Sequence, residues 1–168
     1  GELLNFKETN ELLEALLLSV YTPTKYIKEE CKKKYIEKYS LKGKHGGDMS
    51  FDVQSRGMIV LHRFNLFKRL ESSVFSFEET LRRLLERIER TEQLLLKGSG
   101  EVDQEDADFD DSGDDGVYIE GKYEIDVRDL RIDDYLEDLA SDKYIIAEIH
   151  KNARKILEEE RDRKLIDL

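Results

Sequence analysis

Apolar residues between Gly57 and Lys97 follow a heptad pattern, because they recur at alternating spacings of three and four residues. The residues of this heptad seam, one threonine included, are Phe67, Leu70, Val74, Phe77, Leu81, Leu84, Ile88, Thr91 and Leu95. No proline interrupts the segment, and its only glycine is the first residue. The pattern predicts one long helix of about 60 Å, at a rise of about 1.5 Å per residue, with another helix packed along the seam.

Two shorter helices are predicted before the heptad seam. Leucines at helical spacing give the first helix one apolar face over about residues 6–20. A second helix is expected over about residues 23–39, because Thr22 can cap its amino end and Pro23 suits its first position. Its lysines lie beside an aromatic edge, so this helix is basic and amphipathic. The glycines of residues 41–52 then predict a loop.

The heptad seam is followed by a helix end and an acidic segment. Residues 97–100, KGSG, place a lysine and two glycines where the long helix should stop. Residues 98–116 are acidic and nearly free of apolar side chains, so we expect an acidic flexible linker. Alternating apolar positions in residues 117–126 allow a small β-hairpin.

Apolar residues at helical spacing predict two more helices, over about residues 130–140 and 142–160, with Ser141 as a cap between them. The predicted fold class is mainly all-α, an elongated helical bundle that is antiparallel and coiled-coil-like around the one long helix. We expect residues 1–168 to form a single helical domain. Since the chain begins without methionine and stops inside a helical pattern, we also expect a fragment of a larger protein.

Charge is distributed unevenly, which changes the meaning of the net charge of −11. Residues 21–90 carry 16 basic and 10 acidic side chains, whereas residues 101–143 carry 4 basic and 18 acidic ones. The first region can face a polyanion, and the second would repel one. The single Cys31 excludes an internal disulfide, and no apolar run approaches the ~18 residues of a membrane span. We therefore expect a cytoplasmic protein without a membrane partner.

The sequence lacks the motifs of several common functional sites. No GxxxxGK phosphate loop occurs, so we do not expect an NTPase of the common kind. A calcium loop beginning at Asp108 fails at its twelfth position, where Ile119 replaces the required glutamate, and a solvated acidic linker is the better interpretation. His45, His62 and His150 are isolated from one another in the sequence. No catalytic, cofactor-binding or metal-ligating residue is predicted in this chain.

Basic residues on the predicted long helix are candidates for an external contact. Arg69, Arg83 and Arg90 fall, together with Ser76, on one outer line with a spacing of seven residues. Such a line can follow a phosphate backbone, with neighbouring serines as neutral donors. The candidate contact residues are Lys68, Arg69, Ser72, Ser73, Arg82 and Arg83.

The same helix face has a second interpretation, as a solvated surface that neutralises its own charge. Glutamates stand four residues before three arginines, the favourable order for helix ion pairs worth about 0.3–0.5 kcal/mol each. The pairs are Glu78 with Arg82, Glu79 with Arg83, and Glu86 with Arg90. Three serines within residues 72–76 also lower the helix propensity, which marks this stretch as a candidate contact region. Both interpretations stay open at this point.

Residues 68–83, KRLESSVFSFEETLRR, resemble a segment of large bacterial helicase-like proteins of superfamily 2, of the Snf2-related type. Residues 21–27, YTPTKYI, and 161–168, RDRKLIDL, look like the two edges of the same region in those proteins. There, a helical insert joins two RecA-like lobes that bind ATP and Mg²⁺. The resemblance is most specific at residues 68–73 and covers most of the chain.

This resemblance implies a non-catalytic accessory domain of an ATP-dependent helicase or translocase that acts on DNA. The flanking lobes would be its partners, the insert would set their geometry, and the candidate residues would contact DNA or a lobe. ATP and Mg²⁺ would belong to the larger protein, a hydrolase, and not to this chain. The alternative function is a coiled-coil protein–protein interaction module without a nucleic-acid role, which forms a homodimer through the heptad seam.

Overall fold

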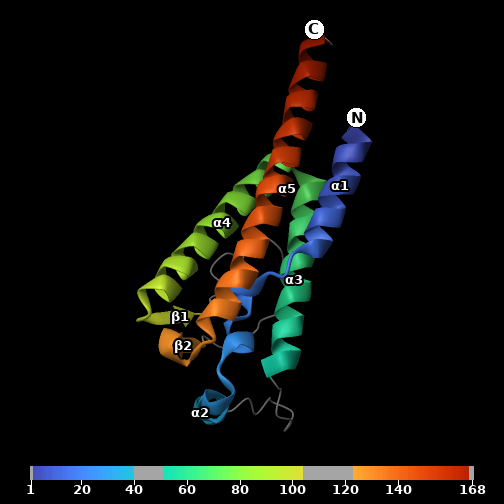
Figure 1. Ribbon diagram of the computed structural model, residues 1–168. Coiled ribbons are helices and arrows are strands. Elements are labelled where there is room, and N and C mark those ends of the chain that lie inside the picture. The colour runs from blue at the N-terminus through green and yellow to red at the C-terminus, as the bar shows by residue number, and fades with distance from the viewer. Residues whose placement is uncertain (1, 40–50, 104–122, 167–168) are drawn as a thin grey trace.

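The chain folds into an elongated bundle of helices with one small antiparallel sheet (Figure 1). The computed structural model describes residues 2–39, 51–103 and 123–166. Its α-helices are α1 (Glu2–Ala15), α2 (Lys32–Lys38), α3 (Phe51–Ser72), α4 (Val74–Lys97) and α5 (Ile132–Ile166). The 3₁₀ helices are η1 (Ser19–Tyr21), η2 (Pro23–Tyr26), η3 (Glu29–Cys31) and η4 (Val127–Asp129), and the strands are β1 (Glu101–Asp103) and β2 (Glu124–Asp126). The prediction of a mainly all-α fold with a small pair of strands is confirmed.

Helix α5 runs along the bundle and packs against both α1 and α4. α1 lies antiparallel to α5, so the two ends of the described chain lie toward the same end of the bundle (Figure 1). The predicted break at Ser141 is wrong, because α5 is one continuous helix of 35 residues. Ser141 is exposed, while the neighbouring Asp142 turns its carboxylate inward to partners outside the helix. An aspartate is tolerated inside a helix when its carboxylate does not compete for the hydrogen bonds of the helix backbone.

Asp142 holds the irregular segment that follows α1. Its buried carboxylate accepts hydrogen bonds from the backbone N–H groups of Leu17 (2.8 Å) and Ser19 (2.9 Å) and from Ser19 Oγ (2.9 Å). Arg63 Nη2 also donates to the carbonyl of Leu16 (2.6 Å). These bonds satisfy backbone groups that a longer helix would have paired, so the prediction that the first helix reaches residue 20 is wrong.

The helix predicted over residues 23–39 is α-helical only in its last part, α2. Pro23 begins a helix as predicted, but this helix is the short η2, after which Ile27 has extended backbone. There the Lys28 N–H donates to the carbonyl of Asp129 (2.8 Å), just before α5 begins. The backbone therefore pairs with a distant segment instead of continuing the helix.

The predicted long helix is also wrong, because it consists of two helices, α3 and α4, that fold back on each other at Ser73 (Figure 1). Ser73 has extended backbone, with φ −163° and ψ 115°, and its Oγ accepts a hydrogen bond from the Ser76 N–H at 3.2 Å. Serine is a preferred amino-terminal cap, so this bond begins a new helix in place of extending the old one. We call residues 68–83, on both sides of the break, the α3–α4 corner.

The heptad seam lies in the core of the single chain. From Leu70 onward its apolar members are buried, and α4 packs against α5. These members are Leu70, Val74, Phe77, Leu81, Leu84, Ile88 and Leu95. The predicted end of the seam is confirmed, since Gly98 has a φ of 72° and its N–H bonds to the carbonyls of Leu94 (3.2 Å) and Leu95 (3.1 Å).

A small sheet lies where α4 leads toward α5 (Figure 1). β1 and β2 pair antiparallel, with the buried Val102 opposite the buried Ile125. The strand pair is not contained in residues 117–126 as predicted, because β2 pairs with β1, which lies in the segment expected to be a flexible linker. Residues 104–122 lie outside the described residues, and with them most of that linker and the calcium-loop register.

Helix α3 is apolar on two opposite sides. Val53, Val60 and Phe64 are 48%, 66% and 62% exposed, respectively. Spacings of seven and four residues place these three on one stripe, which we call the outer stripe of α3. The opposite side of the helix is buried and includes Met58, Leu66 and Leu70. Despite its two apolar sides, neither α3 nor any other described helix is long and apolar enough to cross a membrane.

Candidate functional site

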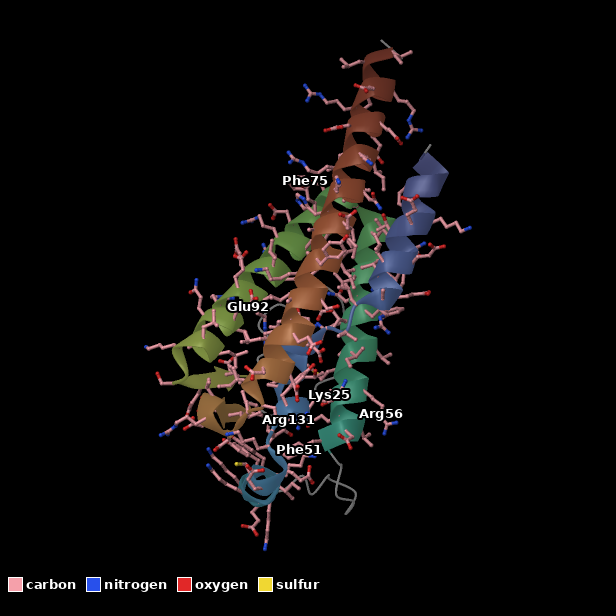
Figure 2. The ribbon with its side chains drawn as sticks, viewed as in Figure 1. Lys25, Phe51, Arg56, Phe75, Glu92 and Arg131 are labelled. Atoms are coloured by element: carbon pink, nitrogen blue, oxygen red, sulfur yellow. The ribbon has the colours of Figure 1, made fainter. Side chains whose placement is uncertain are left out.

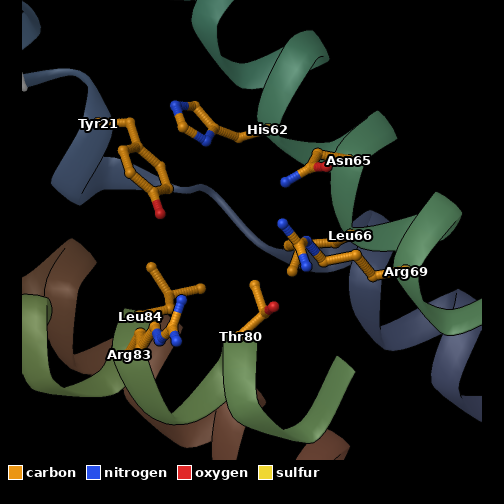
Figure 3. A pocket seen from close by; sticks show the side chains of 8 residues that line it. All are labelled: Tyr21, His62, Asn65, Leu66, Arg69, Thr80, Arg83 and Leu84. Atoms are coloured by element: carbon orange, nitrogen blue, oxygen red, sulfur yellow. The ribbon is translucent and has the colours of Figure 1, made fainter. Parts of the chain in front are cut away.

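A polar pocket opens between α3, α4 and η1 at the α3–α4 corner (Figure 3). It is lined by Tyr21, His62, Asn65, Leu66, Arg69, Thr80, Arg83 and Leu84. Two of these residues, Arg69 and Arg83, are among the sequence-predicted contact residues. The fold brings them to one pocket from two different helices, because α4 doubles back beside α3.

The pocket follows from the helical spacing of its polar residues. On α3, His62, Asn65 and Arg69 recur at three and four residues and therefore share a side of the helix. On α4, Thr80 and Arg83 are three residues apart and face them across the hairpin (Figure 3). Each helix adds one buried leucine to the lining, Leu66 from α3 and Leu84 from α4, so the polar groups lie beside apolar side chains.

Arg69 connects the two helices at the corner. Its side chain is half-buried, and Nη1 donates a hydrogen bond to the Ser76 Oγ at 3.2 Å. Its Nε is buried and has no hydrogen-bond partner among the described residues. A buried donor without an acceptor costs about 1–3 kcal/mol, so an acceptor that entered the pocket would recover free energy there.

Arg83 lies at the open side of the pocket, with its side chain 56% exposed. Its nearest recorded ion pair is loose, with 3.9 Å between Nη2 and Glu79 Oε2. The guanidinium of Arg83 therefore keeps most of its donors for solvent or a ligand. Thr80 offers no such donor, because its Oγ1 donates to the Ser76 carbonyl at 2.9 Å.

An aromatic stack forms the inner wall of the pocket. The rings of Tyr21 and His62 are parallel within 4°, with 3.5 Å between their centroids, and the Arg87 guanidinium lies 4.9 Å from the Tyr21 ring centroid. Burial, together with the positive charge of Arg87, lowers the pKa of His62 to about 3. His62 is therefore neutral at pH 7, and the positive charge around the pocket comes from arginine.

The other predicted contact residues have local partners. Ser72 Oγ donates to the Lys68 carbonyl (2.8 Å), and Ser73 caps α4. Arg82 forms ion pairs with Glu86 (3.1 Å) and Glu79 (3.7 Å), which are not the pair predicted for it, since Glu78 lies instead 3.0 Å from His150 Nε2. All six predicted residues lie at the α3–α4 corner, but only Arg69 and Arg83 line the pocket.

The predicted outer line of Arg69, Ser76, Arg83 and Arg90 is not one straight line along a helix. The break at Ser73 divides it, so Arg69 turns toward Ser76 across the corner. Arg90 lies two turns beyond Arg83 on α4 and does not line the pocket. A continuous basic track along one 60 Å helix, as the heptad pattern suggested, is therefore wrong.

Sequence reasoning missed four polar or aromatic residues of the pocket. His62 was considered only as an isolated histidine, and Tyr21, Asn65 and Thr80 were not considered as site residues. A signal existed in the polar stripe that His62, Asn65 and Arg69 form on one side of α3. The contribution of Tyr21 has no local signal, because it depends on Asp142 holding the segment before it.

No protein-family model, curated protein or solved structure matches this chain. Within the described residues, no group of three or more His, Cys, Asp or Glu side chains is placed to hold a metal ion. Cys31 packs beside the core, where burial and the Asp129 carboxylate raise the pKa of its thiol. A thiol of raised pKa is a poor nucleophile, so the arginine pocket is the strongest candidate site of the described chain.

Proposed function

We propose that this chain is a non-catalytic helical accessory domain of an ATP-dependent, Snf2-related superfamily 2 helicase or translocase that acts on DNA in the cytoplasm. In this proposal it joins two RecA-like lobes and sets their relative geometry. The lobes hold ATP and Mg²⁺ and perform hydrolysis. The α3–α4 corner is the part of the domain that contacts DNA or a lobe.

The arrangement of the chain ends is the observation that supports this proposal most directly. α1 and α5 pack antiparallel, so the described chain enters and leaves toward one end of the bundle (Figure 1). The α3–α4 corner lies toward that same end, as the position of Phe75 indicates (Figure 2). A domain inserted between two lobes has both connections on one side, and residues beside those connections are the ones that a lobe can reach.

The resemblance of residues 68–83 supports the proposal independently, because it falls on the same corner. Three of the six candidate residues there, Lys68, Arg82 and Arg83, are exposed cations. Cations on a surface supply the sequence-independent part of DNA affinity through phosphate contacts. The corner therefore combines the resemblance, the position beside the chain ends and the charge.

The proposal is tested in the full-length protein by the substitution Lys68→Glu. We expect DNA-stimulated ATP hydrolysis to fall about tenfold, or roughly 1.4 kcal/mol, while hydrolysis without DNA is unchanged. The matched control is Arg56→Glu, which makes the same kind of change at the opposite end of α3 (Figure 2). Equal effects of both substitutions, or a full-length protein without a GxxxxGK loop, would contradict the proposal.

The alternative of a coiled-coil interaction module makes a different prediction. Its homodimer would use the heptad seam, but the seam from Leu70 to Leu95 is buried within the single chain. A seam dimer therefore requires α5 to leave its own α4, for example by exchange between two copies. Light scattering separates the two functions, because a seam dimer has twice the mass and the accessory domain does not need one.

A further inference from the structure

We infer that the pocket at the α3–α4 corner is a binding site for a phosphate-type oxyanion, held between Arg69 of α3 and Arg83 of α4. This inference deepens the proposed function by naming the chemical group that the corner recognises. It rests on that function only for the source of the phosphate, which would be the DNA backbone. The pocket chemistry is the same for a free ion.

The donors of the pocket suit an oxyanion. Each guanidinium presents several N–H groups in a planar fork that matches the oxygens of a phosphate. Arg69 has a buried Nε for which the described part of the chain provides no acceptor, and the side chain of Asn65 points into the same space (Figure 3). Donors thus converge from two helices, and Arg69 is held in place by its bond to Ser76.

The charge around the pocket is positive and only weakly neutralised. None of the eight lining residues is acidic, and Arg87 stands behind the Tyr21 ring. The nearest recorded carboxylate contact of Arg83 is at 3.9 Å, whereas that of Arg82, one residue earlier, is at 3.1 Å. Arg83, which lines the pocket, therefore has a longer ion-pair distance within the chain than Arg82, which does not line it.

The aromatic residues favour a phosphate over a nucleobase. Base recognition usually needs an aromatic face on which the base can stack. One face of the Tyr21 ring is covered by His62 and the other is approached by Arg87. Because neither face is open, the pocket offers hydrogen-bond donors to a ligand and no stacking platform.

The test titrates inorganic phosphate into the 168-residue chain at constant ionic strength and follows the Arg69 Nε–H and Asn65 amide signals by NMR. We expect saturable shifts at millimolar phosphate, which sodium chloride does not reproduce. Arg83→Ala should weaken binding about tenfold. Arg82→Ala, which removes the same charge from the adjacent residue outside the pocket, should leave it unchanged. Shifts that do not saturate, or equal losses in both variants, would overturn the inference.

A second titration with a short DNA duplex distinguishes the source of the phosphate. Duplex that competes with inorganic phosphate, and that loses affinity in Arg83→Ala more than in Arg82→Ala, supports both the pocket and its role on DNA. Phosphate binding without any duplex binding keeps the pocket as an ion site and contradicts the DNA contact of the proposed function. Duplex binding that both substitutions reduce equally is charge attraction alone and overturns the assignment of the DNA backbone as the source of the phosphate.

Discussion

Helices α3 and α4 are neighbours in the chain and partners in one hairpin, yet different interactions determine which face each helix buries. α4 has one apolar side, the heptad seam, and a charged outer side with ion pairs such as Arg82 with Glu86. α3 has apolar residues on both sides, and its outer stripe remains exposed. The apolar pattern alone therefore orients α4, whereas it leaves two candidate faces for α3.

Buried polar contacts orient α3. Gln54 Nε2 donates to the Tyr123 hydroxyl at 2.8 Å, and the Ser55 and Thr24 hydroxyls share a hydrogen bond of 3.1 Å. His62 stacks on the ring of Tyr21 further along the same side. A buried polar group that loses its partner is costly, so these contacts specify the face of α3 that the hydrophobic effect does not.

The largest difference is expected between two phenylalanines of α4. Phe77 is fully buried in the seam, and Phe75, two residues earlier, is 66% exposed (Figure 2). Phe77→Ala should lower the free energy of unfolding by about 3–5 kcal/mol, because it leaves a cavity. Phe75→Ala should change it by less than about 0.5 kcal/mol. Urea unfolding measures both, and similar losses would show that α4 is not one-sided.

Acid should act on α3 through His62. Its pKa is about 3 when folded and about 6.5 when unfolded, so between these values the unfolded state binds more protons. The free energy of unfolding is therefore highest above pH 6.5 and decreases as the pH is lowered, by about 2 kcal/mol at pH 5. Urea unfolding from pH 5 to 8 measures this slope, which His62→Gln should flatten. A folded-state His62 that titrates near pH 6.5 by NMR would contradict the expectation.

The boundary between the two helices depends on one serine. Ser73→Ala removes the cap of α4 and should lower the free energy of unfolding by about 1 kcal/mol. Ser72→Ala is the matched control, because Ser72 only bonds back to the Lys68 carbonyl within α3 and alanine has the higher helix propensity. Denaturant unfolding should show a loss for the first variant alone. If Ser72→Ala is equally destabilising, the cap is not what separates α3 from α4.

The smallest effect is expected on the outer stripe of α3. Gly57 lies within the helix, and a Cβ added there meets nothing within 4 Å. Gly57→Ala should therefore raise the free energy of unfolding by about 0.5–1 kcal/mol through helix propensity. The rise in unfolding midpoint measures it, and a loss of stability would mean that this side of α3 is covered.

The parts of the fold that local patterns govern were predictable. The seam of α4, its end at Gly98 and the mainly helical class follow from spacing and from glycine. The end of α1, the continuity of α5 and the extended backbone at Ile27 were not, because partners more than 100 residues away decide them. The break at Ser73 lies between these cases: its three serines were noticed, but the heptad spacing ran through them without interruption.

The candidate site shows the same division. Arg69 and Arg83 were identified from their spacing of fourteen residues, or two heptads, along a supposed single helix. They do lie together, but for a different reason, since the hairpin turns one helix toward the other. Tyr21 and His62 join them through long-range packing, which no local pattern of the sequence encodes.

The pairing of β1 with β2 makes one point of the bundle suitable for grafting. Asp103 and Glu124 stand opposite each other, and the Tyr39 hydroxyl both accepts from the Glu124 N–H (2.9 Å) and donates to its carbonyl (3.0 Å). The chain between the strands thus starts and finishes at one fixed place. Doubling the length of such a connection costs only about 0.6 kcal/mol in closure entropy. A fluorescent reporter inserted between Asp103 and Glu124 would therefore leave the packing of the helices unchanged and report the rotation of the bundle.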